Sequence, residues 1–127
     1  LERKRWIAFA GQPRGSIRID CGAVDALLNR KKSLLPSGVI EVKGDFNIGD
    51  LVSVVNEDGL EVARGLSNFS AVEVEKIKGH KTTSLLKILG HKSYDEVVHR
   101  NKLVCVRPLS ESGIEMRAGL GGESESR

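Results

Sequence analysis

Residues 20–65 read DCGAVDALLNRKKSLLPSGVIEVKGDFNIGDLVSVVNEDGLEVARG and carry the strongest structural signals in this chain of 127 residues. Asp20 has the side chain of a helix N-cap, because its carboxylate can accept hydrogen bonds from the free N–H groups of a following first turn. Apolar residues then recur with helical spacing at Ala23, Val24, Leu27 and Leu28. We therefore predict a helix over 22–32 with one apolar stripe.

Three cations, Arg30, Lys31 and Lys32, stand at the end of this predicted helix. Cations suit the negative end of a helix dipole, and the same side chains could form a basic rim beside the next loop. These two roles are compatible. The loop Ser33–Gly38 cannot continue the helix, since Pro36 disfavours helical geometry in the residue before it.

The remaining signals predict short strands. Glu57-Asp58-Gly59 separates two apolar β-branched runs, 51–56 and 60–65, and this pattern predicts a hairpin because Gly tolerates positive φ. Further strands are expected at 5–9, 16–20, 39–43, 96–100 and 103–106, and short helices at 71–78 and 83–89. The predicted fold class is mainly β, a small α+β domain: a barrel-like sheet of five to six short strands, with the early helix sealing one end and two short late helices.

The length fits one domain, which we place at 16–107. Residues 1–15 form a basic lead-in, and its Arg3-Lys4-Arg5 cluster fits a linker from an upstream domain better than a phosphate-binding arm. The first residue is Leu1 rather than Met, which favours a fragment of a longer protein. Residues 108–127 are rich in Ser, Gly and Glu, and we expect a polar, flexible tail that buries little.

Composition narrows the class of partner. The net charge is +3, and the tail carries four Glu and two Arg, so the rest of the chain is +5. This charge permits a polyanionic partner without requiring one.

Aromatic residues are only 4%, which predicts a core of Val, Ile, Leu and Ala. The chain has no apolar run of about 18 residues and no signal-peptide pattern, so we expect a cytoplasmic domain without a membrane partner.

The sequence contains no catalytic constellation that we recognise: a P-loop, a G-x-G-x-x-G turn after a strand and a G-x-S-x-G elbow are all missing. His80 and His91 each follow a Gly at a predicted helix end and lack the Cys pair or HExxH of a zinc site, so we expect no metal. Cys21 and Cys105 are expected to be buried, reduced thiols. By itself, the chain is predicted to be a binding or accessory module.

Four motifs in order resemble a PUA domain, a small pseudo-barrel named for pseudouridine synthases and archaeosine transglycosylases. They are Asp20-x-Gly22-Ala23, Ser33-Leu34-Leu35-Pro36-x-Gly38-Val39, Gly44-x-Phe46-x-x-Gly49-Asp50 and Ala63-Arg64-Gly65-Leu66. With Arg3-Lys4-Arg5-Trp6-Ile7, Ile77-x-Gly79-His80 and Val97-Val98-His99-Arg100-Asn101, the pattern is similar to the C-terminal domain of the glutamate 5-kinase family. This resemblance covers about 3–106.

The resemblance implies an accessory role. Glutamate 5-kinases phosphorylate the side-chain carboxylate of glutamate with ATP, open proline synthesis and are inhibited by proline. Their chemistry belongs to an upstream amino-acid-kinase domain, so ATP and Mg²⁺ would bind there and this chain would hold no cofactor. Its expected partner is that kinase domain, with a role in regulation or assembly and a homo-oligomer formed through the parent enzyme.

In RNA-modifying enzymes, PUA domains bind structured RNA through the first helix and the loop after it. The resemblance places this surface at Arg30, Lys31, Lys32, Ser33, Leu34, Pro36 and Gly38. Backbone N–H groups and cations suit phosphates, although no aromatic residue stands in the loop to stack on a base. Two alternatives therefore stay open: a free-standing RNA-binding PUA module, and a protein–protein module whose charges are merely solvated.

Overall fold

The computed structural model describes residues 11–106, so the predicted strand at 5–9 and the tail lie outside it. The lead-in and tail boundaries stay predictions. In chain order the strands and helices are β1 (Gly15–Ile19), α2 (Cys21–Leu28), β2 (Val39–Gly44), β3 (Leu51–Val55), β4 (Glu61–Leu66), α3 (Ala71–Ile77), α4 (Leu85–Leu89) and β5 (Leu103–Cys105). Single 3₁₀ turns add η1 (Pro36–Gly38), η2 (Thr82–Ser84) and η3 (Arg100–Lys102).

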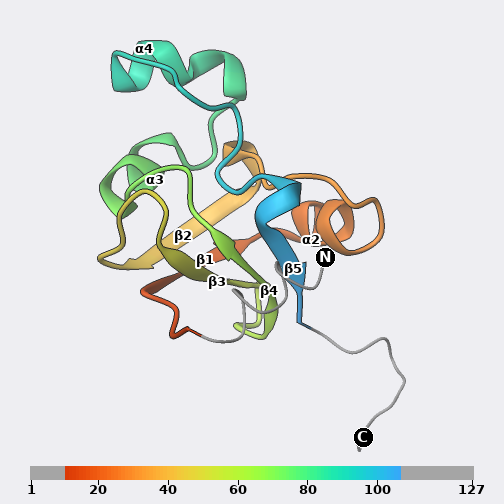
Figure 1. Cartoon of the computed structure of the whole chain (residues 1–127). Coiled ribbons are helices and arrows are strands. Elements are labelled where there is room, and N and C mark those ends of the chain that lie inside the picture. Colours follow the sequence, from red (N-terminus) through yellow and green to blue (C-terminus); the bar gives the residue numbers. More distant parts are fainter. Residues whose placement is uncertain (1–10, 107–127) are drawn as a thin grey trace, which may run out of the picture.

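The strands form one sheet in the order β2-β1-β3-β4-β5. β1 pairs antiparallel with β2 and parallel with β3, while β3–β4 and β4–β5 are antiparallel. The sheet is open among the described residues, with β2 and β5 at its edges. In Figure 1, α2 and α3 lie to the two sides of the strands, and α4 stands clear of them. The predicted five-stranded, small α+β fold class is confirmed.

The β3–β4 hairpin forms where Asp-Gly predicted it. Gly59 has a φ of 88°, in the left-handed region that this turn requires and that Gly adopts at low cost. The side-chain oxygen of Asn56 accepts from the N–H groups of Asp58 and Leu60 at 2.9 and 3.0 Å, which fixes the turn from inside. Local hydrogen bonds therefore hold the turn that joins the two strands.

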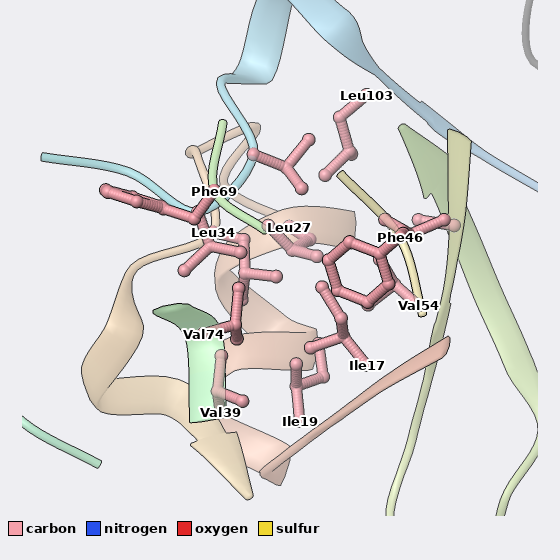
Figure 2. Packing of buried hydrophobic residues seen from close by; sticks show 14 of the residues in the cluster. Ile17, Ile19, Leu27, Leu34, Val39, Phe46, Val54, Phe69, Val74 and Leu103 are labelled. Atoms are coloured by element: carbon pink, nitrogen blue, oxygen red, sulfur yellow. The ribbon is translucent and has the colours of Figure 1, made fainter. Parts of the chain in front are cut away.

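The core lies between the sheet and its helices (Figure 2). Ile17 and Ile19 of β1 meet Leu27 of α2, so the apolar stripe of the helix does seal this end of the sheet. The predicted core composition is wrong in one respect: Phe46 and Phe69 are both fully buried and are the largest fully buried side chains. The other buried hydrophobic side chains among the described residues are Val, Ile, Leu and Ala, as predicted.

Two element predictions need correction. The first helix ends at Leu28 rather than at residue 32, so the cations lie beyond it and not in its last turn. Residues 96–100 do not form a strand; they make only an isolated bridge between Leu34 and Val98, followed by η3. Their apolar run is buried by packing on a loop, and that arrangement produces the same sequence pattern as a strand.

The cysteine prediction is half right. Cys21 and Cys105 are not joined to each other by a disulfide, but Cys21 is exposed at the start of α2, and Cys105 is partly buried. Among residues 11–106, no helix is long and apolar enough to cross a membrane.

Candidate functional site

Asp20 joins the start of α2 to the loop that follows the helix. Its Oδ1 accepts from the backbone N–H of Ala23 at 2.8 Å, which confirms the predicted N-cap. Its own N–H donates to the carbonyl of Gly38 at 3.0 Å. One residue thus holds the first turn of α2 beside the end of the loop.

The end of α2 exposes the three predicted cations. Asn29 caps the helix, and Lys31 has a φ of 56°, the only positive φ outside glycine in the described chain. This left-handed residue turns the chain, and the N–H of Lys32 returns to the carbonyl of Ala26 at 2.9 Å. Arg30, Lys31 and Lys32 are therefore exposed on a tight reversal and do not lie along the helix.

The loop Ser33–Gly38 is fixed by distant segments. The N–H of Leu34 donates to the carbonyl of Val98 at 2.9 Å, and the N–H of Val97 donates back to the carbonyl of Leu34 at 2.7 Å. The Ser33 hydroxyl oxygen accepts from the N–H of Arg100 at 2.8 Å. The loop is consequently a rigid wall, held by the segment that leads into β5.

The far end of the loop is held by the chain after α3. The carbonyl of Pro36 accepts from the N–H of Gly79 at 2.9 Å, and Pro36 itself is buried. A Cβ built on Gly38 would lie 2.7 Å from the Cβ of Ala23, closer than two carbon atoms can pack. Only glycine at this position lets the loop lie directly against α2.

A groove of about 410 Å³ opens between α2 and this loop. Its floor has small side chains and its rim has cations. The lining residues are Asp20, Gly22, Ala23, Ala26, Arg30, Lys32, Ser33, Leu35, Ser37 and Gly38. The groove thus combines hydroxyl groups of Ser33 and Ser37 and the cations Arg30 and Lys32 with one carboxylate, Asp20, whose Oδ1 already accepts from the N–H of Ala23. The hydroxyl groups and cations suit an anionic ligand.

The structure brings part of the predicted site together. Arg30, Lys32, Ser33 and Gly38 line the groove, while Lys31 is exposed beside it. Leu34 and Pro36 do not face a ligand: both are buried, and they serve by fixing the loop. The predicted site residues did not include six of the lining residues: Asp20, Gly22, Ala23, Ala26, Leu35 and Ser37. The sequence identified Asp20 only as an N-cap, and its place beside the loop follows from the long-range hydrogen bond to Gly38.

One carboxyl group of the described chain has a clearly displaced pKa, and it lies on the sheet rather than in the groove. Burial by itself raises the pKa of Glu61, but hydrogen bonds from Arg64 and Ser53, at 2.8 and 2.6 Å, together with the Arg64 charge, outweigh burial and hold the pKa below its usual 4.5. Residues 11–106 contain no group of three or more His, Cys, Asp or Glu that could hold a metal ion.

The comparisons with known proteins agree with one another. The family model "PUA domain" matches residues 15–89. Glutamate 5-kinase of Syntrophus aciditrophicus is 50% identical over 105 residues, 83% of this chain and 27% of the relative. Glutamate 5-kinase of Thermoanaerobacter sp. strain X514 is 55% identical over 102 residues, 80% of this chain and 27% of the relative. The chain thus spans about a quarter of the length of these curated relatives.

Among solved structures, a PUA domain from Aeropyrum pernix K1 in a tartrate complex is 22% identical to this chain. Its TM-score is 0.48, and the match covers 70% of this chain and 45% of that one.

Proposed function

The chain belongs to the PUA domain family, and we propose that it is the non-catalytic C-terminal domain of a glutamate 5-kinase. The observation that carries this proposal is the identity of 50–55% to glutamate 5-kinases over four-fifths of the chain. Such an enzyme transfers a phosphoryl group from ATP to glutamate and so makes the glutamyl 5-phosphate of proline biosynthesis. The part of the relatives that this chain does not span would supply the ATP and Mg²⁺ sites.

The domain would then act on the kinase by contact, through regulation or assembly, in the cytoplasm. Its structure supports a rigid contact surface: the loop beside α2 is hydrogen-bonded at both ends to later segments of the chain. A rigid surface loses little conformational entropy when a second domain docks on it. Removal of the domain is expected to leave phosphoryl transfer working and to change proline inhibition or oligomeric state.

The native protein itself provides the test. An antibody raised against this chain would capture the product from source cells, and its mass would be compared with the 13.8 kDa of the chain. We expect a product several times heavier, with glutamate-dependent ATP turnover in the captured material. A product near the mass of the chain, without such turnover, would refute the proposal.

A second candidate function is binding of structured RNA, with or without a kinase domain. The groove favours it, because Arg30 and Lys32 stand on the rim with Lys31 beside them, and the loop offers hydroxyl groups and backbone at the same place. Lysine and arginine contacts to phosphates release counterions, so this affinity would fall steeply with salt.

Replacing Arg30, Lys31 and Lys32 together with Ala tests RNA binding. If each contacts one phosphate, the slope of log affinity against log salt should become shallower by about 2 to 3. Lys43→Ala is the matched control, because Lys43 is exposed at the opposite end of the β1–β2 ladder from Gly38. Failure of the unaltered chain to bind any RNA hairpin at low salt would end this second proposal.

A further inference from the structure

The segment from Lys76 to Tyr94 has a charge pattern that the proposed functions do not explain. It contains five lysines and two histidines and not one Asp or Glu, although charged residues make up 29% of the chain with nearly balanced signs. Glu75 and Asp95 bound it on either side. A run of this length with one sign of charge on a folded surface attracts anions over several ångströms.

Two of the five lysines of this segment, one toward each end, make ion pairs. Lys78 pairs with Glu75 at 2.7 Å, and Lys92 pairs with Asp95 at 2.9 Å. Lys81 and Lys87 lie between these pairs, are exposed and make no ion pair within residues 11–106. Lys76 of α3 is also exposed and makes no ion pair within residues 11–106, so Lys81 and Lys87 are the unpaired lysines that follow α3.

Packing holds these lysines outward. Leu85 of α4 is fully buried and belongs to the core. The Nε2 atom of His91, after α4, lies 3.4 Å from Oε2 of Glu73 in α3, so the chain is folded back onto α3. Figure 1 shows the result: α4 stands clear of the sheet, on a protrusion well away from α2.

The segment begins beside the groove. The N–H of Gly79 donates to the carbonyl of Pro36 at 2.9 Å, in the loop that forms one wall of the groove. Arg30 and Lys32 stand on the α2 side of this loop, and the segment that holds Lys81 leaves from its other end. The loop thus lies between two separate groups of cations.

We propose that Lys81 and Lys87 form a second phosphate-binding bank, and that the ligand is a folded RNA whose two strands contact the two banks. The inference rests on the RNA-binding function proposed above and adds to it the form of the ligand. One strand lies along the groove rim, and a second strand lies against the protrusion. A single strand follows one groove, whereas a double-stranded stem presents two backbones to two separated sets of lysines.

RNA fits this surface better than an acidic protein does. The exposed lysines are single point charges on long side chains, which suit phosphates that are repeated along a backbone. Leu86, which is 58% exposed, and Tyr94, which is 43% exposed, are the exposed large hydrophobic side chains of the segment as the structure describes it, and two such residues make a small apolar anchor for a protein interface.

The test compares two probes with two double variants of the full 127-residue chain. The probes are an RNA hairpin with a stem of roughly two helical turns, a span similar to that of other double-strand binders, and a single-stranded oligouridine of equal length. The variants are Lys81→Gln with Lys87→Gln, and a matched control, Arg14→Gln with Lys43→Gln. Arg14 and Lys43 are exposed near the Gly15–Gly44 pair, at the far end of β1 and β2 from the groove.

We expect the Lys81/Lys87 variant to bind the hairpin with a salt slope shallower by about 1.4 to 1.8, and the control variant to keep the original slope. Oligouridine binding should change equally in both variants. Thermal unfolding of the two variants should coincide, because all four side chains are exposed. This combination would support the two-bank interface.

Three other results would overturn RNA binding as a whole or the second lysine site alone. If the unaltered chain binds neither probe, RNA binding itself fails, and the second bank fails with it. If it binds the hairpin, and Arg30/Lys31/Lys32→Ala weakens binding while the Lys81/Lys87 variant matches the control, only the second bank is refuted. If the Lys81/Lys87 variant keeps its RNA slope and instead changes sedimentation, the protrusion contacts protein, and the inference is wrong.

Discussion

The substitution Gly38→Ala would test how the candidate groove is built. A Cβ on Gly38 would lie 2.7 Å from the Cβ of Ala23, so α2 and the loop must move apart by close to an ångström to reach ordinary contact. The hydrogen bond from the N–H of Asp20 to the carbonyl of Gly38, at 3.0 Å, opposes that movement. The strain falls on the two walls of the groove.

The expected cost follows from two opposing effects. Overpacking of this kind costs about 1–3 kcal/mol, and the reduced entropy of the unfolded chain returns about 0.4–1 kcal/mol. A loss of about 1–2 kcal/mol in the free energy of unfolding remains, which for a domain of this size lowers Tm by roughly 4–15 °C. The control is Gly22→Ala in α2, where the nearest atom to an added Cβ is an Asp20 oxygen at 3.5 Å. There we expect a gain of up to about 1 kcal/mol, because alanine favours a helix over glycine.

A double-mutant cycle decides whether this contact is the cause. Ala23→Gly removes the methyl group that the new side chain meets, and alone it costs about 0.5–1 kcal/mol. We expect the double variant Gly38→Ala/Ala23→Gly to lose about 1–2 kcal/mol less free energy of unfolding than the two single variants lose together. Urea denaturation of the three variants measures this difference. Simple additivity, or a Gly38→Ala variant as stable as the unaltered chain, would refute the close packing of loop on helix.

Three further predictions concern the N-cap, the sheet carboxyl and the thiols. Asp20→Ala should lower the free energy of unfolding by about 1 kcal/mol in urea, whereas Asp20→Asn should lower it far less; equal losses would exclude capping. The lowered pKa of Glu61 contributes stability above pH 4.5 that is lost as pH falls through the folded-state pKa, so Glu61→Gln should flatten the acid limb of a pH–stability curve. An unchanged limb would contradict that assignment. Native protein should react with a thiol reagent quickly at exposed Cys21 and slowly at Cys105, with mass mapping showing which residue is labelled first; equal rates would contradict the structure.

The fold was predictable from sequence where the signal is local. The Asp20 cap, the hairpin around Gly59 and the strands beside them depend on residues within about five positions of each other, and each formed as predicted. The helix end was not predictable in this way. Residues 29–32 have no helix-breaking residue, and only the left-handed Lys31 in the structure shows that the chain reverses there.

The candidate site was predicted in outline and not in its contacts. The loop to which the resemblance points lines the groove, and its role in binding stays a prediction. Buried Leu34 cannot be told from a ligand-facing residue without the bridge to Val98, which lies far along the chain. The same pairing explains why the predicted strand at 96–100 was wrong: its apolar residues are buried by that loop. Contacts at such sequence separation leave no periodic signal in either segment.

By itself, the sequence determined which family this protein belongs to, where the first helix is capped and where the hairpin turns, because caps, turns and motif spacing are short-range properties. Only the tertiary structure decided that Gly38 must lie against Ala23 and that Leu34 and Pro36 support the groove without lining it. It alone also showed that the lysine-rich segment after α3 begins beside the loop of the groove. Those facts depend on which distant segments pack together. That packing is the outcome of burying one shared core, and no local stretch of the chain specifies it.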